Sequence, residues 1–139
     1  MKKFVPFLLA SILMIGLIGY GINSCQRFPK IDPEQVDTVS VWVHTSQWNM
    51  TSSDVDKFIN LYNASKYKGE GTGEGGTPAF GVEVYFADGS ELHIHDFQAM
   101  GRDFEVTFFD ASGERTAWYY INNQALLEYL CKMAEPAYP

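Results

Sequence analysis

Cysteine is scarce in this sequence, with two cysteines in 139 residues. Cys25 directly follows a long apolar run, and Cys131 lies in an apolar helical pattern that predicts burial. A cysteine beside a membrane segment and a shielded thiol cannot pair, so no disulfide framework is expected. A catalytic cysteine would need exposure and a neighbouring base, and the sequence around Cys131 indicates neither. The aromatic and β-branched residues must therefore supply the core.

Positive charge is also in short supply: 10 lysines and arginines stand against 17 aspartates and glutamates. The formal net charge is −7. Nucleic acids and anionic lipid surfaces are bound through basic patches, so this balance argues against both as partners.

Catalytic signatures are missing as well. The sequence contains no H-E-x-x-H, no P-loop and no nucleophile elbow. The stretch 71–76 satisfies G-x-G-x-x-G, but it follows a predicted helix and precedes a predicted strand. A dinucleotide site needs the opposite order, so a flexible connection is the better interpretation. We therefore expect a binding or regulatory module without enzymatic activity.

An uncharged apolar run, residues 4–22, follows Met1 and two lysines. Its length is close to the roughly 20 residues that cross a bilayer. The positive start predicts a cytoplasmic amino end, which places the rest of the chain on the extracytoplasmic side of the membrane.

The residues at the end of this run, Ile22-Asn23-Ser24-Cys25, resemble the lipobox of bacterial lipoproteins. The resemblance implies that Cys25 is diacylated and becomes the new amino terminus after cleavage, at a bacterial cell membrane. The run is longer than the apolar core of about 7–15 residues typical of secretory signals, so an uncleaved signal anchor is the alternative. Either outcome predicts a signal or anchor over 1–25, a tether over 26–36 and one domain over 37–135.

The domain reads as an α+β fold with an antiparallel sheet of about five strands. Residues 37–44 alternate as a strand, 51–68 carry helical spacing with lysines at the end, and 79–121 read as a four-stranded meander. A second helix is predicted over 123–134. Both helices are expected on one face of the sheet.

The hairpin around Asp88-Gly89 predicts its own register. The apolar residues of both strands share a face only in registers whose paired residue numbers sum to an even value. A three-residue loop with Gly89 as the left-handed bulge residue selects the register in which Glu83 lies opposite His93 and Tyr85 opposite Glu91. The polar side chains of these strands then point away from the helices.

This outward face carries the candidate functional residues, and two interpretations stay open. His93 and His95, with His44 and Glu83, could hold zinc or another transition metal, because imidazole suits such ions. Alternatively, the face is an ordinary solvated surface on which Trp42 and Tyr85 contact an envelope protein or peptide. No other cofactor is indicated.

The lipobox resemblance leads to the first prediction. Cys25→Ala should abolish acylation and leave a longer, uncleaved chain in the membrane, because cleavage requires the lipidated cysteine. Mass spectrometry of the amino terminus measures both effects. An intact Met1 on the native protein would rule out lipoprotein processing and leave the signal anchor.

Overall fold

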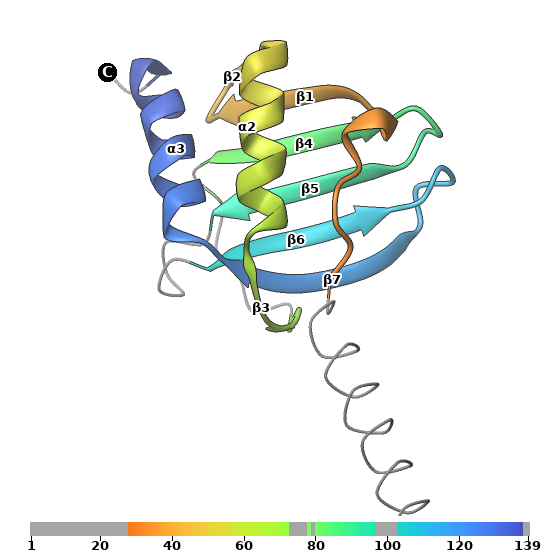
Figure 1. The fold of residues 1–139 in the computed structure, drawn as a ribbon. Helices are drawn as coiled ribbons and strands as arrows, with labels where there is room; N and C mark the ends of the chain where they lie inside the picture. Colours follow the sequence, from red (N-terminus) through yellow and green to blue (C-terminus); the bar gives the residue numbers. More distant parts are fainter. Residues whose placement is uncertain (1–27, 73–77, 79, 97–102, 138–139) are drawn as a thin grey trace, which may run out of the picture.

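The computed structural model describes residues 28–72, 78, 80–96 and 103–137. These residues form one seven-stranded antiparallel sheet and two α-helices, which lie on the same face of the sheet (Figure 1). In chain order, the elements are η1 Pro33–Gln35, β1 Val36–Val43, β2 Ser46–Asn49, α2 Ser52–Asn63, β3 Lys66–Glu70, β4 Phe80–Phe86, β5 Glu91–Asp96, β6 Phe104–Phe109, β7 Arg115–Asn122, α3 Gln124–Ala134 and η3 Glu135–Ala137. The strand order is β2-β1-β4-β5-β6-β7-β3.

The α+β class and the antiparallel meander from β4 to β7 are confirmed, but the sheet has seven strands instead of about five. The first addition is β2, which pairs back onto β1 with Val43 opposite Ser46. Its two-residue loop is made by His44, with φ 51°, and Thr45. Two-residue hairpin loops need a positive φ, which glycine or asparagine usually supplies. Histidine does so here, so the usual sequence signal for this hairpin is missing.

The second addition is β3, which the sequence pattern assigns to the end of the first helix. That helix ends at Asn63, and Lys66–Glu70 instead pairs with the outer edge of β7. Lys66 and Lys68 are exposed there. Lysines are favourable both at a helix C-terminus and on a protected edge strand, so Lys66 and Lys68 did not distinguish a longer helix from a separate strand.

One face of the sheet forms the core together with the helices. Val82, Val84 and Ile94 are at most 1% exposed, and they alternate with outward-facing polar residues. Helix α2 buries Phe58, Ile59 and Tyr62 against this face. Helix α3 buries Leu126, Leu130 and Ala134.

Both helix starts are capped as their sequences predict. The hydroxyl of Thr51 accepts a hydrogen bond from the amide of Asp54. The side-chain oxygen of Asn123 accepts from the amides of Ala125 and Leu126. These caps satisfy backbone donors that a helix leaves without partners inside itself.

Within the predicted tether over 26–36, residues 28–35 pack against the domain. Phe28 and Ile31 are 7% and 3% exposed, and this segment crosses the same face as the helices (Figure 1). The side chain of Asn63 accepts from the amide of Ile31 and donates to its carbonyl, both at 2.8 Å. An amide side chain thus pairs with this segment as a neighbouring strand would.

A buried hydroxyl pair joins this segment to the helix and the sheet. The hydroxyls of Tyr62 on α2 and Tyr119 on β7 lie 2.7 Å apart, and Tyr62 also donates to the carbonyl of Pro29. Burial raises the pKa of Tyr119 to about 12, and burial also raises the pKa of Tyr62. Both hydroxyls therefore stay protonated and hydrogen-bonded in the core.

Cys131 is exposed, so its predicted burial is wrong. Helix α3 meets the sheet through the row containing Leu126 and Leu130, and Cys131 lies on the neighbouring exposed surface. The predicted anchor over 1–25, the glycine-rich residues 73–77 and the turn at 97–102 lie outside the described residues.

The two hydrogen bonds between the Asn63 side chain and the backbone of Ile31 lead to a stability prediction. Asn63→Ala removes two hydrogen bonds, and we expect it to lower the free energy of unfolding by about 2 kcal/mol, at about 1 kcal/mol for each bond. Asn60→Ala on an exposed position of the same helix is the matched control, and it should cost nothing. Denaturant titration of the full chain in a nonionic detergent, followed by tryptophan fluorescence, measures both. Equal losses of unfolding free energy in the two variants would contradict a stabilising role for these two hydrogen bonds.

Candidate functional site: the open face of the sheet

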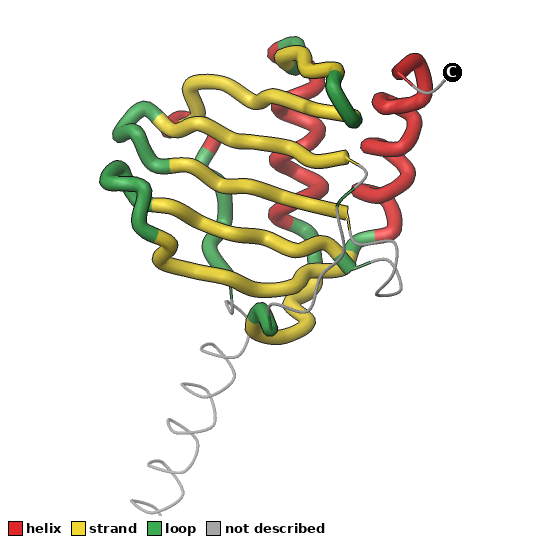
Figure 2. Tube along the Cα trace, turned by 180° about the vertical axis from the view of Figure 1, so that it is seen from behind, coloured by secondary structure: helices red, strands yellow, loops and turns green. Residues whose placement is uncertain are grey.

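The candidate site is the sheet face that points away from the helices, which we call the open face. Figure 2 shows this side, and no described helix covers it. The predicted register of its central hairpin is confirmed: Glu83 lies opposite His93, and Tyr85 lies opposite Glu91. Trp42 on β1 pairs with Gly81, so it belongs to the same face.

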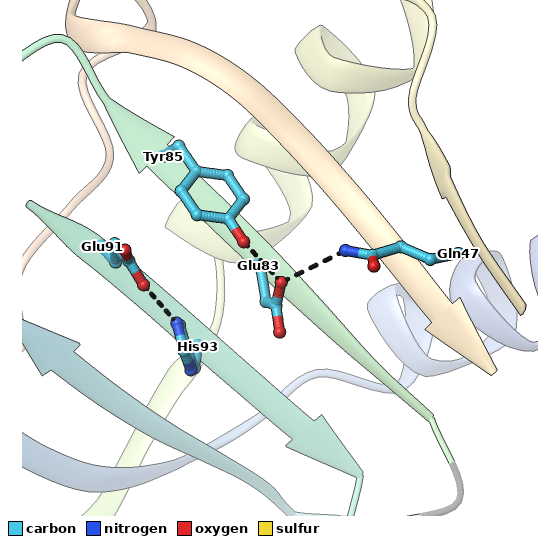
Figure 3. Close-up of polar contacts among 5 residues, drawn as sticks. All are labelled: Gln47, Glu83, Tyr85, Glu91 and His93. Carbon is cyan, nitrogen blue, oxygen red and sulfur yellow. Dashed lines mark hydrogen bonds and ion pairs between the residues drawn. The ribbon is translucent and has the colours of Figure 1, made fainter. Parts of the chain in front are cut away.

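Two short polar networks order the middle of the open face (Figure 3). One carboxylate oxygen of Glu83 accepts from the Tyr85 hydroxyl at 2.7 Å and from the Gln47 amide at 3.4 Å. This hydrogen bond to Glu83 is the main cause that raises the pKa of Tyr85 to about 12. The second network joins His93 Nε2 and Glu91 Oε2 at 2.8 Å.

His95 differs from His93 in its surroundings. Burial lowers the pKa of His95 below its usual 6.5, and the neighbouring His93 lowers it further. The edge of its ring meets the Trp42 ring at 5.7 Å between centroids. His95 therefore favours the neutral imidazole at neutral pH.

The metal hypothesis draws on four residues, and the structure brings some of them together. The rings of His93 and His95 lie 6.3 Å apart on one face, with Glu83 on the adjacent strand. His44 belongs to the loop between β1 and β2 and is exposed. Among the described residues, no three histidine, cysteine, aspartate or glutamate side chains gather closely enough to hold a metal ion.

Two tryptophans lie against glycines on the open face. A Cβ atom on Gly81 would come within 2.6 Å of the Trp42 ring, and one on Gly71 within 2.2 Å of the Trp118 ring. In each pair the ring covers backbone that a glycine leaves bare, a known way to support glycine in a sheet. These close contacts hold both indoles in defined positions.

The face contains residues that the sequence analysis did not name: Glu105 and Phe109 on β6, and Arg115 and Trp118 on β7. The same alternation along these strands points to them, because Thr107 lies opposite both His93 and Trp118. The shift in register between β6 and β7 at Phe109 obscures that pattern near Arg115. Burial raises the pKa of Glu105, while Trp118 and the positive charge of Arg115 act to lower it.

A hollow of about 360 Å³ lies at one end of the open face, between the β4–β5 and β6–β7 turns. The rings of His93 and Phe109 stand 5.0 Å apart beside it. Asp110 ties the second turn through its hydrogen bonds to the Ser112 amide and hydroxyl. The residues lining the hollow are Gly89, Glu91, His93, Phe109, Asp110, Ala111, Ser112 and Gly113.

Comparison with protein-family models, with curated proteins and with solved structures found no significant match. Within the described part of the chain, no helix is both long and apolar enough to cross a bilayer. The apolar run 4–22 and Cys25 lie outside that part.

The spacing of the histidines leads to a prediction about metal. We expect titration of the full chain with Zn²⁺ to show no uptake tighter than micromolar, because zinc sites use three or four protein ligands and His93 already contacts Glu91. The double variant His93→Asn, His95→Asn is the control and should give the same weak heat. Stoichiometric, tighter uptake that this variant loses would instead establish a metal site.

Proposed function

We propose that this chain is a membrane-anchored, non-enzymatic binding module on the extracytoplasmic side of a bacterial cell membrane. Its open face would contact an envelope protein or peptide. The observation that carries this proposal is the asymmetry of the sheet. Two helices and residues 28–35 cover one face, and no described helix covers the other (Figures 1 and 2). That other face presents partly exposed aromatic and hydrogen-bonding side chains.

Aromatic side chains on this face suit protein recognition because tyrosine and tryptophan dominate the energetics of many interfaces. Trp42 lies against Gly81, and the Tyr85 hydroxyl is bonded to Glu83. Rings that are already held in place lose little conformational freedom on binding, and this reduces the cost of association. The ordered face is therefore better suited to binding than a surface of mobile side chains.

The packing of Phe28 supports a short connection between anchor and domain. The Phe28 ring lies 5.8 Å from that of Tyr119 on β7. Two residues separate Cys25 from Phe28, so the three Cα–Cα steps between them span at most about 11 Å. An anchor at Cys25 would therefore hold the β7 side of the sheet close to the bilayer.

Transition-metal binding is the second candidate function. The specific observation in its favour is the pair of imidazoles, His93 and His95, on one face with their ring centroids 6.3 Å apart. The zinc titration described above separates it from partner binding.

Photo-crosslinking tests the binding module. With p-benzoylphenylalanine in place of Tyr85, on the open face, we expect a discrete covalent adduct in intact cells, because a partner would lie within reach of this side chain. The same replacement at the exposed Lys132 of α3 is the matched control and should give none. Gel mobility and mass spectrometry identify the adducts. Adducts from position 132 but not from position 85 would place the partner on the helices and contradict the proposal.

A further inference from the structure

The open face is strongly biased in charge. The five neighbouring strands β2, β1, β4, β5 and β6 contain no lysine or arginine. By register, Glu83, Glu91 and Glu105 all belong to this face. Arg115 on β7 is the nearest cation by strand order within the described strands, and its guanidinium lies over the Trp118 ring at 4.5 Å. In these five described strands, aromatic rings and carboxylates thus share a surface without lysine or arginine, and Arg115 lies opposite Phe109 on the next strand.

The hollow between the two hairpin turns combines both kinds of group at one point. Glu91 and Phe109 lie directly opposite each other on β5 and β6, and both line the hollow. The Glu91 side chain is 39% exposed and that of His93 is 24% exposed, so the pair is accessible from solvent. The hollow of about 360 Å³ is within the range of roughly 300–1,000 Å³ found for ligand pockets.

We infer that the partner of the open face is a cationic polypeptide segment, one of whose arginine or lysine side chains enters this hollow. Its charged head meets the Glu91 carboxylate while its stem or guanidinium plane packs on Phe109. This inference rests on the proposed binding function and names the chemistry of the partner.

The chemistry of the residues supports a cation over other occupants. A carboxylate binds guanidinium and ammonium groups through charge-assisted hydrogen bonds, and an aromatic face attracts the same groups through its quadrupole. Arg115 over Trp118 is an example of this contact within the chain. An anionic partner would be repelled by three carboxylates. Further basic residues along the segment would meet Glu83 and Glu105.

The test uses the full chain in a nonionic detergent and a short peptide of alternating arginine and serine. The control peptide carries citrulline in place of arginine, which keeps the shape of the side chain and removes its charge. We expect the arginine peptide to bind at least about tenfold more tightly than the citrulline peptide. Its affinity should fall as the NaCl concentration is raised, because salt screens charge pairs. Isothermal titration calorimetry measures both affinities.

Matched variants locate the contact. Glu91→Gln should weaken binding of the arginine peptide about fivefold, which is near the upper end for the contribution of an exposed ion pair. Glu128→Gln, at an exposed position on α3, removes the same charge far from the hollow and should leave binding unchanged. Phe109→Leu keeps an apolar side chain and removes the ring, and it should weaken binding about two- to fivefold. Circular dichroism of each variant checks that the fold is retained.

Three results would overturn the inference: equal binding of the arginine and citrulline peptides, equal effects of Glu91→Gln and Glu128→Gln, or saturable binding of a neutral tetrasaccharide without binding of the arginine peptide. A crosslinked partner at position 85 together with no arginine-peptide binding would refute the cationic segment and leave the binding module standing. If position 85 gives no crosslinked partner and the arginine peptide does not bind, both the binding module and the cationic segment are refuted.

Discussion

The alternation of side chains along antiparallel strands is the constraint on which this structure depends. Every strand pair in the sheet is antiparallel, and residues that pair directly across neighbouring strands point to the same face of the sheet. Val82 and Val84 thereby join a continuous apolar face, and Glu83 and Tyr85, which alternate with them, join the open face. The apolar face must be removed from water, and this requirement places α2, α3 and residues 28–35 on the same side.

The covered face is closed by polar contacts as well as by apolar packing. Tyr62 reaches both Tyr119 in the sheet and the carbonyl of Pro29, so one side chain links helix, sheet and amino-terminal segment. Asn63, the next residue, holds the backbone of Ile31. Buried polar groups are costly unless they are paired, so these contacts specify where the segment crosses the sheet. The position of Phe28 follows from them.

The open face remains available because nothing in its own pattern requires burial. Its large rings are supported from below by Gly81 and Gly71, and its carboxylates are held by tyrosine, glutamine and histidine. At one edge of the sheet, Lys66 and Lys68 of β3 are exposed, and edge lysines oppose pairing with another sheet. The proposed binding module would therefore meet its partner through side chains of the open face and not through strand addition at β3.

Some of this organisation could be predicted from the sequence, because it is local. The register of β4 and β5 depends on one tight turn and on alternation over a few residues, so the opposition of Glu83 and His93 was predictable. The start of α3 was predictable as well, because Asn123 caps it directly.

The tertiary structure decided the rest, because those features depend on partners far along the chain. Ile31 finds Asn63 at a separation of 32 residues, so its burial left no local signal. The segment from Lys66 became a strand only because the edge of β7 was there to pair with it. His44 was placed in a turn two strands away from β5 by the order of the sheet. The sequence by itself determined which residues share the open face within a hairpin. The long-range pairing of strands, which no local pattern encodes, decided which of those residues meet.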